Sequence, residues 1–391
     1  MEKYDSSAIR VRRQAVFIGA PVYRRHSYGA NHPLSIPRVS LTCDLIDAYG
    51  AFDAGEYRVG RAATRRELCG FHTDDYVRAV QCSEALGRVT DAIRRRHHIG
   101  NLENPWFPGL FRTPALATGS SILGAQEVLN GRVVFSPAGG MHHAHPDRAQ
   151  GFCYFNDPVL AIQRLRAEGL RVLYLDIDAH HGDGVEAAFA DDPSVFTFSL
   201  HMDTRYAYPF RGGQLADQGG PGGERACLNV PLPRATHDAE YRLVFETLWS
   251  EVLRQFRPGA VVLQAGTDIL YADPLGKFRI TTQLFLAVVQ RVLDDSPRLL
   301  VVGGGGYHPL LVARCWTGVW AVLSGRALPA ALPEAARRVL REVGWDEDED
   351  EDYYESLFAS RLDREQSEPV RGEIHALLDR VRAGHPWMAT A

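Results

Sequence analysis

No run of about 18 apolar residues occurs in the sequence, so a membrane-spanning helix is not expected. The first residues, MEKYDSSAIRVRRQ, lack the apolar core of a secretory signal peptide, and we therefore expect a cytoplasmic protein. The sequence also has no excess of positively charged residues. The formal net charge is -5, which argues against direct binding of nucleic acid, because general nucleic-acid binders are strongly basic.

Cysteine is scarce, and its spacing is uninformative. The chain has six cysteines, and no two of them form a Cys-x-x-Cys pair. Disulfide frameworks and thiolate zinc sites usually show paired spacing. The pattern therefore predicts reduced thiols, as in a cytosolic protein.

The 391 residues are 45% hydrophobic and 23% charged, which is typical of a globular protein with a large core. Short, continuously apolar runs alternate with amphipathic ones, and this alternation predicts an α/β fold with a central, mostly parallel sheet flanked by helices on both faces. The predicted strands are 15–20, 132–137, 171–178, 194–200, 260–266 and 298–304. The predicted helices are 156–169, with Asn156 as N-cap and Gly169 as terminator, and roughly 238–256, 281–295 and 309–324.

We expect a single domain over residues 1–391, with a core of about 15–325 and a helical C-terminal extension, 326–391, packed on it. The extension contains the acidic run DEDEDED, Asp346 to Asp352. A solvated surface loop is the simpler interpretation of this run, and a docking site for a basic partner is the alternative.

Polar side chains follow several predicted strands, at the carboxyl ends where parallel sheets bind ligands. The stretch DIDAHHGDG, residues 176–184, comes after an apolar run, and Asp268 ends a similar run. Asp178, His180 and Asp268 would form a nitrogen and oxygen site for a borderline metal such as zinc, with three protein ligands as in catalytic sites. The alternative is that Asp178 and His180 only cap loop amides.

A second histidine pair, His142 and His143, follows another predicted strand within PAGGMHHAHP. Adjacent histidines cannot face one way on a regular strand, so a loop must present them. Imidazole is a suitable general base, and carboxylates such as Asp176 and Asp183 commonly orient it. Two surface histidines remain the alternative.

The last predicted strand ends in VVGGGGYHP, which carries Tyr307. Three interpretations remain open: a phosphate-binding loop, a structural turn, or a tyrosine that donates to a developing oxyanion. Neither the G-x-G-x-x-G spacing nor G-K-[ST] is present. In GFCYFND, residues 151–157, Phe152 and Tyr154 are core aromatics or walls of an apolar channel.

Taken together, the chain resembles the zinc-dependent histone deacetylase family, in its class I-like branch with the bacterial acetoin-utilisation deacetylases. The resemblance covers roughly residues 15–325 and rests on GGMHHAHPDRAQGFCYFND, RVLYLDIDAHHGDGVEAAF, VVLQAGTD and GGGGYHPLLVARCWT. It implies the arginase–deacetylase fold. It also implies removal of acetyl or other short acyl groups from lysine side chains of protein or peptide substrates, with Zn²⁺, or alternatively Fe²⁺, as cofactor.

The resemblance assigns roles residue by residue. Asp178, His180 and Asp268 match the metal ligands; His143, oriented by Asp183, matches the base; His142, paired with Asp176, matches its partner; and Tyr307 matches the carbonyl-polarising tyrosine. Gly151, Phe152, Tyr208, Glu103 and Leu275 match substrate-binding positions. Asp176, Asp178, His180, Ser199 and Leu200 match a structural potassium site, partly through backbone carbonyls.

Three segments depart from the family pattern. Glu103 stands where an aspartate usually clamps the substrate backbone, AYPFRGG replaces a Pro-Gly-Thr-Gly loop and places Phe210 and Arg211 near the rim, and Ala272 replaces a glycine. These departures bear on acyl-chain and peptide preference rather than on hydrolysis.

Three other functions compete with this interpretation. An acetylpolyamine amidohydrolase would run the same chemistry on a small amine, an arginase-like enzyme would hold two manganese ions, and an inactive module would only bind acyl-lysine. The histidine pair and Tyr307 disfavour the last two. The number of subunits is left open.

Overall fold

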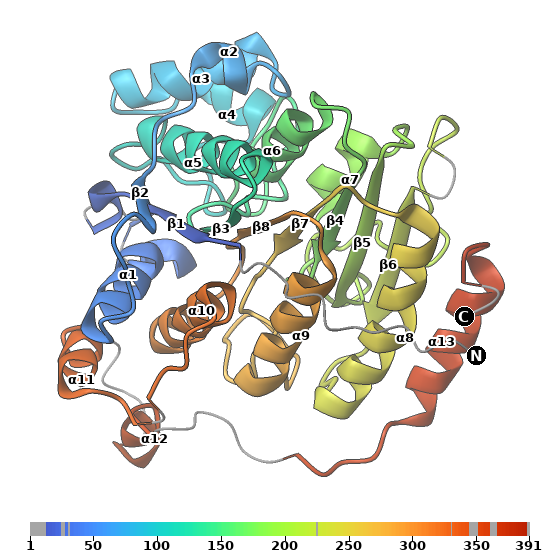
Figure 1. Cartoon of the computed structure of the whole chain (residues 1–391). Coiled ribbons are helices and arrows are strands. Elements are labelled where there is room, and N and C mark those ends of the chain that lie inside the picture. Colours follow the sequence, from blue (N-terminus) through green and yellow to red (C-terminus); the bar gives the residue numbers. More distant parts are fainter. Residues whose placement is uncertain are drawn as a thin grey trace.

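The computed structural model describes residues 13–24, 28–29, 32–223, 226–329, 331–343, 351–359 and 366–388. Its centre is one eight-stranded sheet with the order β2-β1-β3-β8-β7-β4-β5-β6, and every neighbouring pair is parallel (Figure 1). The strands are β1 (Ala15–Gly19), β2 (Tyr57–Val59), β3 (Val133–Ser136), β4 (Val172–Asp176), β5 (Val195–Met202), β6 (Cys227–Leu232), β7 (Ala260–Gln264) and β8 (Leu299–Val302).

Helices cover both faces of the sheet. In Figure 1, α5 and α6 lie on one face, and α1, α8, α9 and α10 on the other. The helices are α1 (Arg38–Ala48), α2 (Arg65–Leu68), α3 (Asp74–Ala85), α4 (Asp91–His97), α5 (Arg112–Leu129), α6 (Asp157–Arg166), α7 (Asp183–Phe189), α8 (Asp238–Phe256), α9 (Thr282–Asp295), α10 (Pro309–Ser324), α11 (Glu334–Arg341), α12 (Glu351–Ser356) and α13 (Gly372–Gly384).

The two helical layers explain why the strands are apolar throughout. In β4, Leu173 and Leu175 belong to the core under α1 and α8–α10, whereas Val172 and Tyr174 belong to the core under α5–α7. Successive side chains of a strand point to opposite faces, so both sets must be apolar. The predicted fold class is confirmed, and the sheet is entirely parallel within the described residues.

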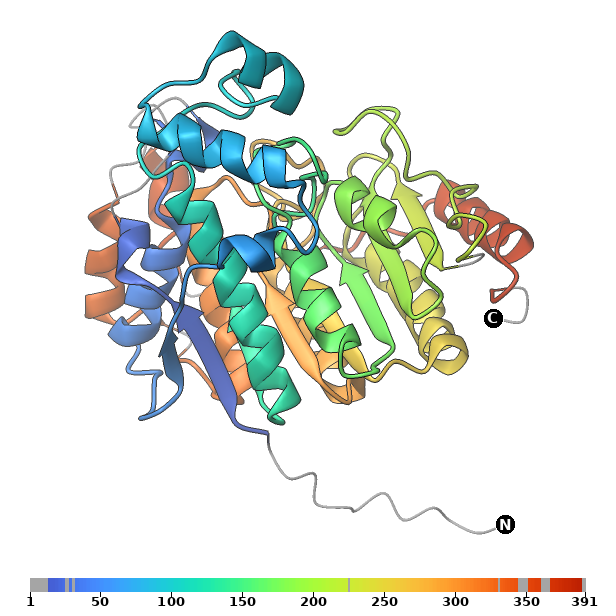
Figure 2. The ribbon, with the colours of Figure 1, turned by 90° about the horizontal axis from the view of Figure 1, so that it is seen from above.

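The carboxyl ends of the strands form one edge of the sheet, beyond which α3 and α4 lie (Figure 2). Tyr76 of α3 donates to the backbone oxygen of Tyr154 at 2.7 Å, and the Ala149 amide donates to the backbone oxygen of His97 at 3.0 Å. These bonds fix the loop between β3 and α6, which carries the predicted histidine pair.

The six predicted strands and four predicted helices are present, and Asn156 caps α6 by accepting from the Val159 amide at 3.2 Å. Two strands escaped prediction. β2 has three residues and is partly exposed, and β6 contains Pro231, which is tolerated because β6 is an edge strand.

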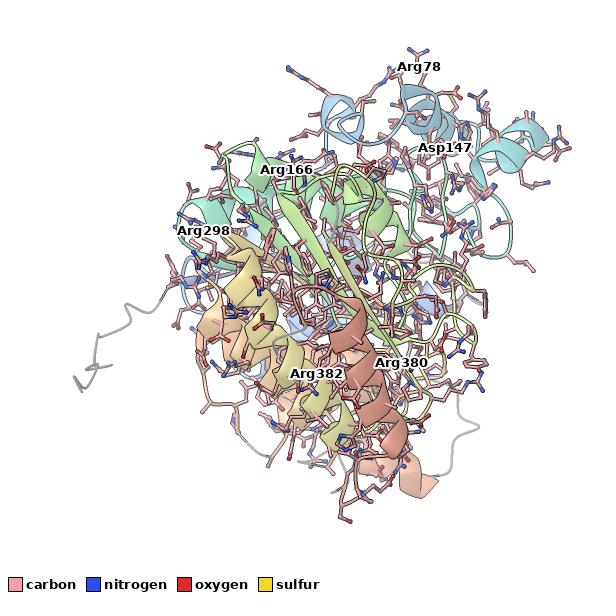
Figure 3. The ribbon with its side chains drawn as sticks, turned by 90° about the vertical axis from the view of Figure 1, so that its right-hand side faces the viewer. Arg78, Asp147, Arg166, Arg298, Arg380 and Arg382 are labelled. Atoms are coloured by element: carbon pink, nitrogen blue, oxygen red, sulfur yellow. The ribbon has the colours of Figure 1, made fainter. Side chains whose placement is uncertain are left out.

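The described part of the C-terminal extension packs on the sheet core. Leu340 of α11 and Leu377 of α13 join the same buried cluster as α1 and α8–α10. Figure 3 shows α13, with Arg380 and Arg382 labelled, beside α8. The acidic run Asp346 to Asp352 lies outside the residues whose side chains the structure describes. Among the described helices, none combines the length and apolar character needed to span a membrane.

Candidate active site and metal centre

Three side chains that could bind a metal meet where β4 and β7 end. Asp178 and His180 follow β4, and Asp268 follows β7, its neighbour in the sheet. His180 Nδ1 lies 2.8 Å from Asp268 Oδ2 and 3.3 Å from Asp178 Oδ1. All three residues are buried, and their candidate ligand atoms lie within 4.8 Å of one another. Sequence reasoning nominated these three, and the fold brings them together.

Backbone amides hold the two carboxylates in place. The Gly305 amide donates to Asp178 Oδ2 at 2.6 Å, and the Ala179 amide donates to Asp268 Oδ1 at 2.9 Å. A Cβ on Gly305 would lie 2.0 Å from Asp268 Oδ2, so only glycine permits this close approach. The predicted glycine-rich loop therefore packs against two carboxylates, which is an unsuitable place for a phosphate.

The electrostatics of this cluster favour a cation. Burial and the charge of Asp178 raise the pKa of Asp268 to about 7, because two carboxylates in a dry site repel each other. A bound dication removes that repulsion. Two buried carboxylates and one imidazole are ligands that fit Zn²⁺, and three protein ligands are usual in its catalytic sites.

The histidine pair lies in the loop after β3, and each imidazole contacts its own carboxylate. His142 Nδ1 is 2.9 Å from Asp176 Oδ2, and His143 Nδ1 is 2.9 Å from Asp183 Oδ1. The two Nε2 atoms are 3.0 Å apart. All four residues lie in the site, so the surface-histidine alternative does not apply.

The pKa values of the two histidines are shifted in opposite directions. Burial opposes protonation of His142, but Asp176 and Asp178 outweigh it and raise the pKa of His142 to about 9. Burial and the neighbouring charge of His142 lower the pKa of His143 to about 4. At neutral pH His142 is therefore charged and His143 is neutral, which leaves His143 as the base of the pair.

Asp183 is held by residues that sequence reasoning passed over. Its Oδ2 accepts from Gln150 Nε2 at 2.5 Å and lies 3.4 Å from His145 Nε2. Arg211 Nη2 donates to Gln150 Oε1 at 2.8 Å. Gln150 stands inside a quoted motif, but nothing in its residue type or spacing indicates this contact. Arg211 was expected only near the rim.

The predicted channel opens over the histidines. A cavity of about 440 Å³ is lined by the channel residues Gly151, Phe152, Tyr208 and Tyr307, with His143 and His180 also in its wall. The Tyr208 and His143 rings are 4.9 Å apart, and the Phe152 and Tyr307 rings 6.0 Å. Leu275, which is 37% exposed, lines the same cavity.

Gly151 and Glu103 brace the channel walls. Gly151 has φ +56°, and a Cβ there would meet His143 Cδ2 at 2.4 Å, so a side chain would displace the base. Glu103 Oε1 accepts from both the Gly151 amide and the Tyr208 hydroxyl. Glu103 therefore links the Gly151 backbone to the Tyr208 side chain.

Tyr307 lines the cavity, and its backbone amide donates to Asp273 Oδ2 at 2.7 Å. Burial raises the pKa of the Tyr307 phenol well above its usual value, so the hydroxyl keeps its proton. Tyr307 can therefore act as a hydrogen-bond donor at neutral pH.

Arg38 of α1 is a site residue that sequence reasoning missed. Its Nη1 donates to the backbone oxygens of Gly304 at 2.7 Å and Gly306 at 3.0 Å, which fixes the loop before Tyr307. Burial lowers the pKa of Arg38. The residue is far from every motif in sequence, and a single arginine at the start of a helix carries no signal of this contact.

The residues expected to bind potassium also meet, because Asp176 of β4 pairs with Ser199 of β5 in the sheet register. Asp178 and His180 follow Asp176, and Leu200 follows Ser199. Ser199 Oγ lies 2.8 Å from His201 Nδ1. Asp176 and Ser199 are therefore neighbours at the carboxyl ends of β4 and β5.

Residues 32–323 match the model of the histone deacetylase domain. Two similar proteins are the acetoin utilization protein AcuC of Bacillus subtilis, 34% identical over 80% of this chain and 83% of that protein, and the histone deacetylase RPD3 of Saccharomyces cerevisiae, 39% identical over 82% and 74%. The crystal structure of a histone deacetylase homolog from Aquifex aeolicus has a TM-score of 0.90 and 39% identity, and the match covers 94% of this chain and 100% of that one.

Proposed function

Because the chain belongs to the histone deacetylase family, we propose that it is a metal-dependent amidohydrolase that removes acetyl or other short acyl groups from the side-chain amine of lysine in proteins or peptides. One observation carries this proposal. Each imidazole of the histidine pair has its own carboxylate, and His143 lines the same cavity as His180 of the metal cluster and the aromatic residues Phe152 and Tyr208.

Asp178, His180 and Asp268 would hold the ion, which is Zn²⁺ in this proposal with Fe²⁺ as the alternative. When bound, such an ion polarises a substrate carbonyl and makes water more acidic. A structural potassium ion would be bound by Asp176, Asp178, His180, Ser199 and Leu200, partly through backbone carbonyls, where it would stabilise the loop that carries two of the metal ligands.

His143 moves the proton in this mechanism. Its neutral Nε2 accepts a proton from the attacking water and delivers it to the lysine nitrogen as the carbon–nitrogen bond breaks. Asp183 holds Nδ1 of that ring, and Nε2 of the charged His142 lies 3.0 Å from Nε2 of His143. Tyr307 donates its hydroxyl to the carbonyl oxygen as that charge develops.

The channel supports lysine over other amines. Phe152 and Tyr208 give it apolar walls that suit the methylene stem of lysine. An acetylpolyamine amidohydrolase is the second candidate, because Glu103 places a carboxylate at the rim. That carboxylate is already engaged by Gly151 and Tyr208, which favours the lysine substrate.

The number of metal-ligand clusters argues against an arginase-like enzyme. The described residues contain one cluster of three potential metal ligands, whereas an arginase-like enzyme needs ligands for two ions.

The six cysteines are all free thiols, which fits the reducing cytoplasm that we propose as the working compartment.

The test is a deacylation panel with matched substrates. We expect kcat/KM for acetyl-lysine peptides to exceed that for acetylated polyamines, and the activity to disappear with a chelator. A kcat/KM that is about tenfold or more higher for acetylpolyamines, equivalent to about 1.4 kcal/mol in transition-state binding, would make the polyamine the substrate instead.

A further inference from the structure

One side of the cavity mouth is lined by apolar side chains. Beyond Phe152 and Tyr208, it is lined by Met202, Leu232 and Leu275. Three of the large exposed hydrophobic side chains, Tyr206 (58%), Phe210 (67%) and Leu275 (37%), also line it. A surface of this kind binds part of a partner rather than water alone.

Two cations line the same side of this mouth, Arg234 and Lys277. They come from neighbouring segments, because the Ala235 amide donates to the Lys277 backbone oxygen at 2.8 Å. The Arg234 guanidinium lies 5.9 Å from the centre of the Tyr206 ring. Lys277 Nζ donates to the backbone oxygen of Pro274 at 2.8 Å. Both charges are thus positioned by neutral groups.

The carboxylates around this mouth are engaged elsewhere. Asp203 accepts from Arg205, Glu103 accepts from Gly151 and Tyr208, and the buried Asp273 accepts from the amides of Leu275, Gly276 and Tyr307. Among the described residues, no carboxylate forms an ion pair with Arg234 or Lys277. Within the described part of the chain, Arg234 and Lys277 are thus two cations without a carboxylate partner in a mouth that Glu103 and Asp203 also line.

We propose that Arg234 and Lys277 select acyl-lysine substrates that carry an aspartate or glutamate close to the acylated residue. The cations lie at the mouth, beside the entry of the stem, so they would contact the peptide flanking the lysine rather than the acyl group. An acidic flank pairs with two unneutralised cations, and a polycationic substrate is repelled by them. The inference rests on the proposed function and names its substrate class.

The experiment compares acetyl-lysine peptides that differ only in one flanking residue. Glutamate, glutamine or lysine stands one or two positions before or after the acetyl-lysine, and kcat/KM is measured at low and at high salt. At low salt we expect the best glutamate peptide to exceed its glutamine partner about three- to tenfold, mainly through KM, as two exposed ion pairs would give. This preference should shrink in high salt.

Substitutions at Arg234 and Lys277 test whether these two cations cause the preference for glutamate-flanked peptides. In Arg234→Gln/Lys277→Gln the glutamate-to-glutamine ratio should fall to about 1, and in Arg234→Glu/Lys277→Glu the lysine-flanked peptide should become the better substrate. The matched control is Arg171→Gln/Arg298→Gln, which removes two charges next to the amino ends of β4 and β8, and it should keep the wild-type ratio. Figure 3 labels Arg298 at that opposite edge.

The outcomes separate the two claims. If no acetyl-lysine peptide is hydrolysed at all, the proposed function is wrong. If peptides are hydrolysed but the glutamate and glutamine versions have equal kcat/KM at low salt, or the preference survives in Arg234→Gln/Lys277→Gln, the inference is overturned while the proposed function stands. Thermal unfolding of each variant checks that a lost preference is not a lost fold.

Discussion

A small number of side chains carry out the proposed chemistry, and only some of them could be identified from the sequence. Asp178, His180 and Asp268 could be nominated because charges at the ends of apolar strands need partners. His142 and His143 could be nominated because imidazole suits proton transfer. Arg38 and Gln150 could not, because their roles depend on contacts with distant residues, the loop at Gly304 and the carboxylate of Asp183.

Tyr307→Phe tests the oxyanion donor. The ring, its packing against Phe152 and the Asp273 contact of the backbone amide remain, and only the hydroxyl is lost. We expect kcat to fall about 10²- to 10³-fold with little change in KM, as for removal of one oxyanion donor.

Steady-state kinetics on an acetyl-lysine peptide measure this effect, with Tyr49→Phe, at the far end of α1, as the control. An activated trifluoroacetyl amide should suffer less from Tyr307→Phe, because its trifluoromethyl group itself stabilises the negative charge on the carbonyl oxygen. Retention of more than about half of the wild-type kcat would make Tyr307 a structural residue.

Strands and helices hold the functional side chains in place. The sequence predicted these elements best where its hydrophobic pattern was regular. β4, β7 and β8 are continuous apolar runs and were predicted. The long helix α5 was not, because its sequence, RTPALATGSSILGAQEVL, is rich in glycine, serine and threonine. In the fold, Thr118 and Ser120 donate their hydroxyls back to the carbonyls of Pro114 and Leu116, which satisfies them inside the helix.

Gly305→Ala tests how the loop after β8 supports the metal cluster. The added Cβ would meet Asp268 Oδ2 at 2.0 Å and lie 3.1 Å from Asp178 Oδ2, so both carboxylates must move. We expect zinc affinity to fall about 10- to 100-fold, the usual cost of disturbing groups that orient ligands.

Competition with a chromophoric chelator measures that affinity. The control is Gly384→Ala at the end of α13, where no atom lies within 4 Å of the added Cβ. Unchanged zinc affinity in Gly305→Ala would mean that the cluster adapts without its backbone support.

Arg371→Leu tests how α13 is attached. Arg371 Nε donates to Glu240 Oε1 at 2.6 Å and Nη2 donates to Oε2 at 2.7 Å, and the Glu240 side chain is fully buried. Leaving that carboxylate short of donors should lower the free energy of unfolding by about 1–3 kcal/mol. Arg380→Leu, on the exposed face of α13, should cost less than about 0.5 kcal/mol.

The contribution of the Glu240–Arg371 pair to the free energy of unfolding should depend on pH. Burial opposes ionisation of Glu240, but the Arg371 hydrogen bonds lower its pKa below the usual value. A depressed carboxyl pKa stabilises the fold above the unfolded pKa of about 4.3, and this contribution is lost as the pH falls through the folded value. Denaturant unfolding should therefore show a difference between wild type and Arg371→Leu at pH 7 that narrows below about pH 4.3. A constant difference would show that Arg371 acts through packing.

At the scale of the whole molecule, the parallel sheet explains why residues from distant segments form one site. Strand order places β4 between β5 and β7, and β8 beyond β7, so their carboxyl ends meet at one edge. The sequence predicted this layout because apolar strands alternate with amphipathic helices. It did not predict the strand order, the two cations Arg234 and Lys277 at the cavity mouth, or the hydrogen bonds of Glu103 to Gly151 and Tyr208, which depend on how loops pack against one another.

We propose that the buried cluster of Asp178, His180 and Asp268 supports metal-dependent deacylation. The most direct measurement is acetate release from an acetyl-lysine peptide by chelator-treated protein titrated with Zn²⁺, beside Asp268→Ala treated in the same way. We expect no release without metal, full recovery near one equivalent of Zn²⁺ in the wild type, and neither bound zinc nor release in Asp268→Ala. Release that survives chelation, or an Asp268→Ala variant that keeps stoichiometric zinc and activity, would contradict it.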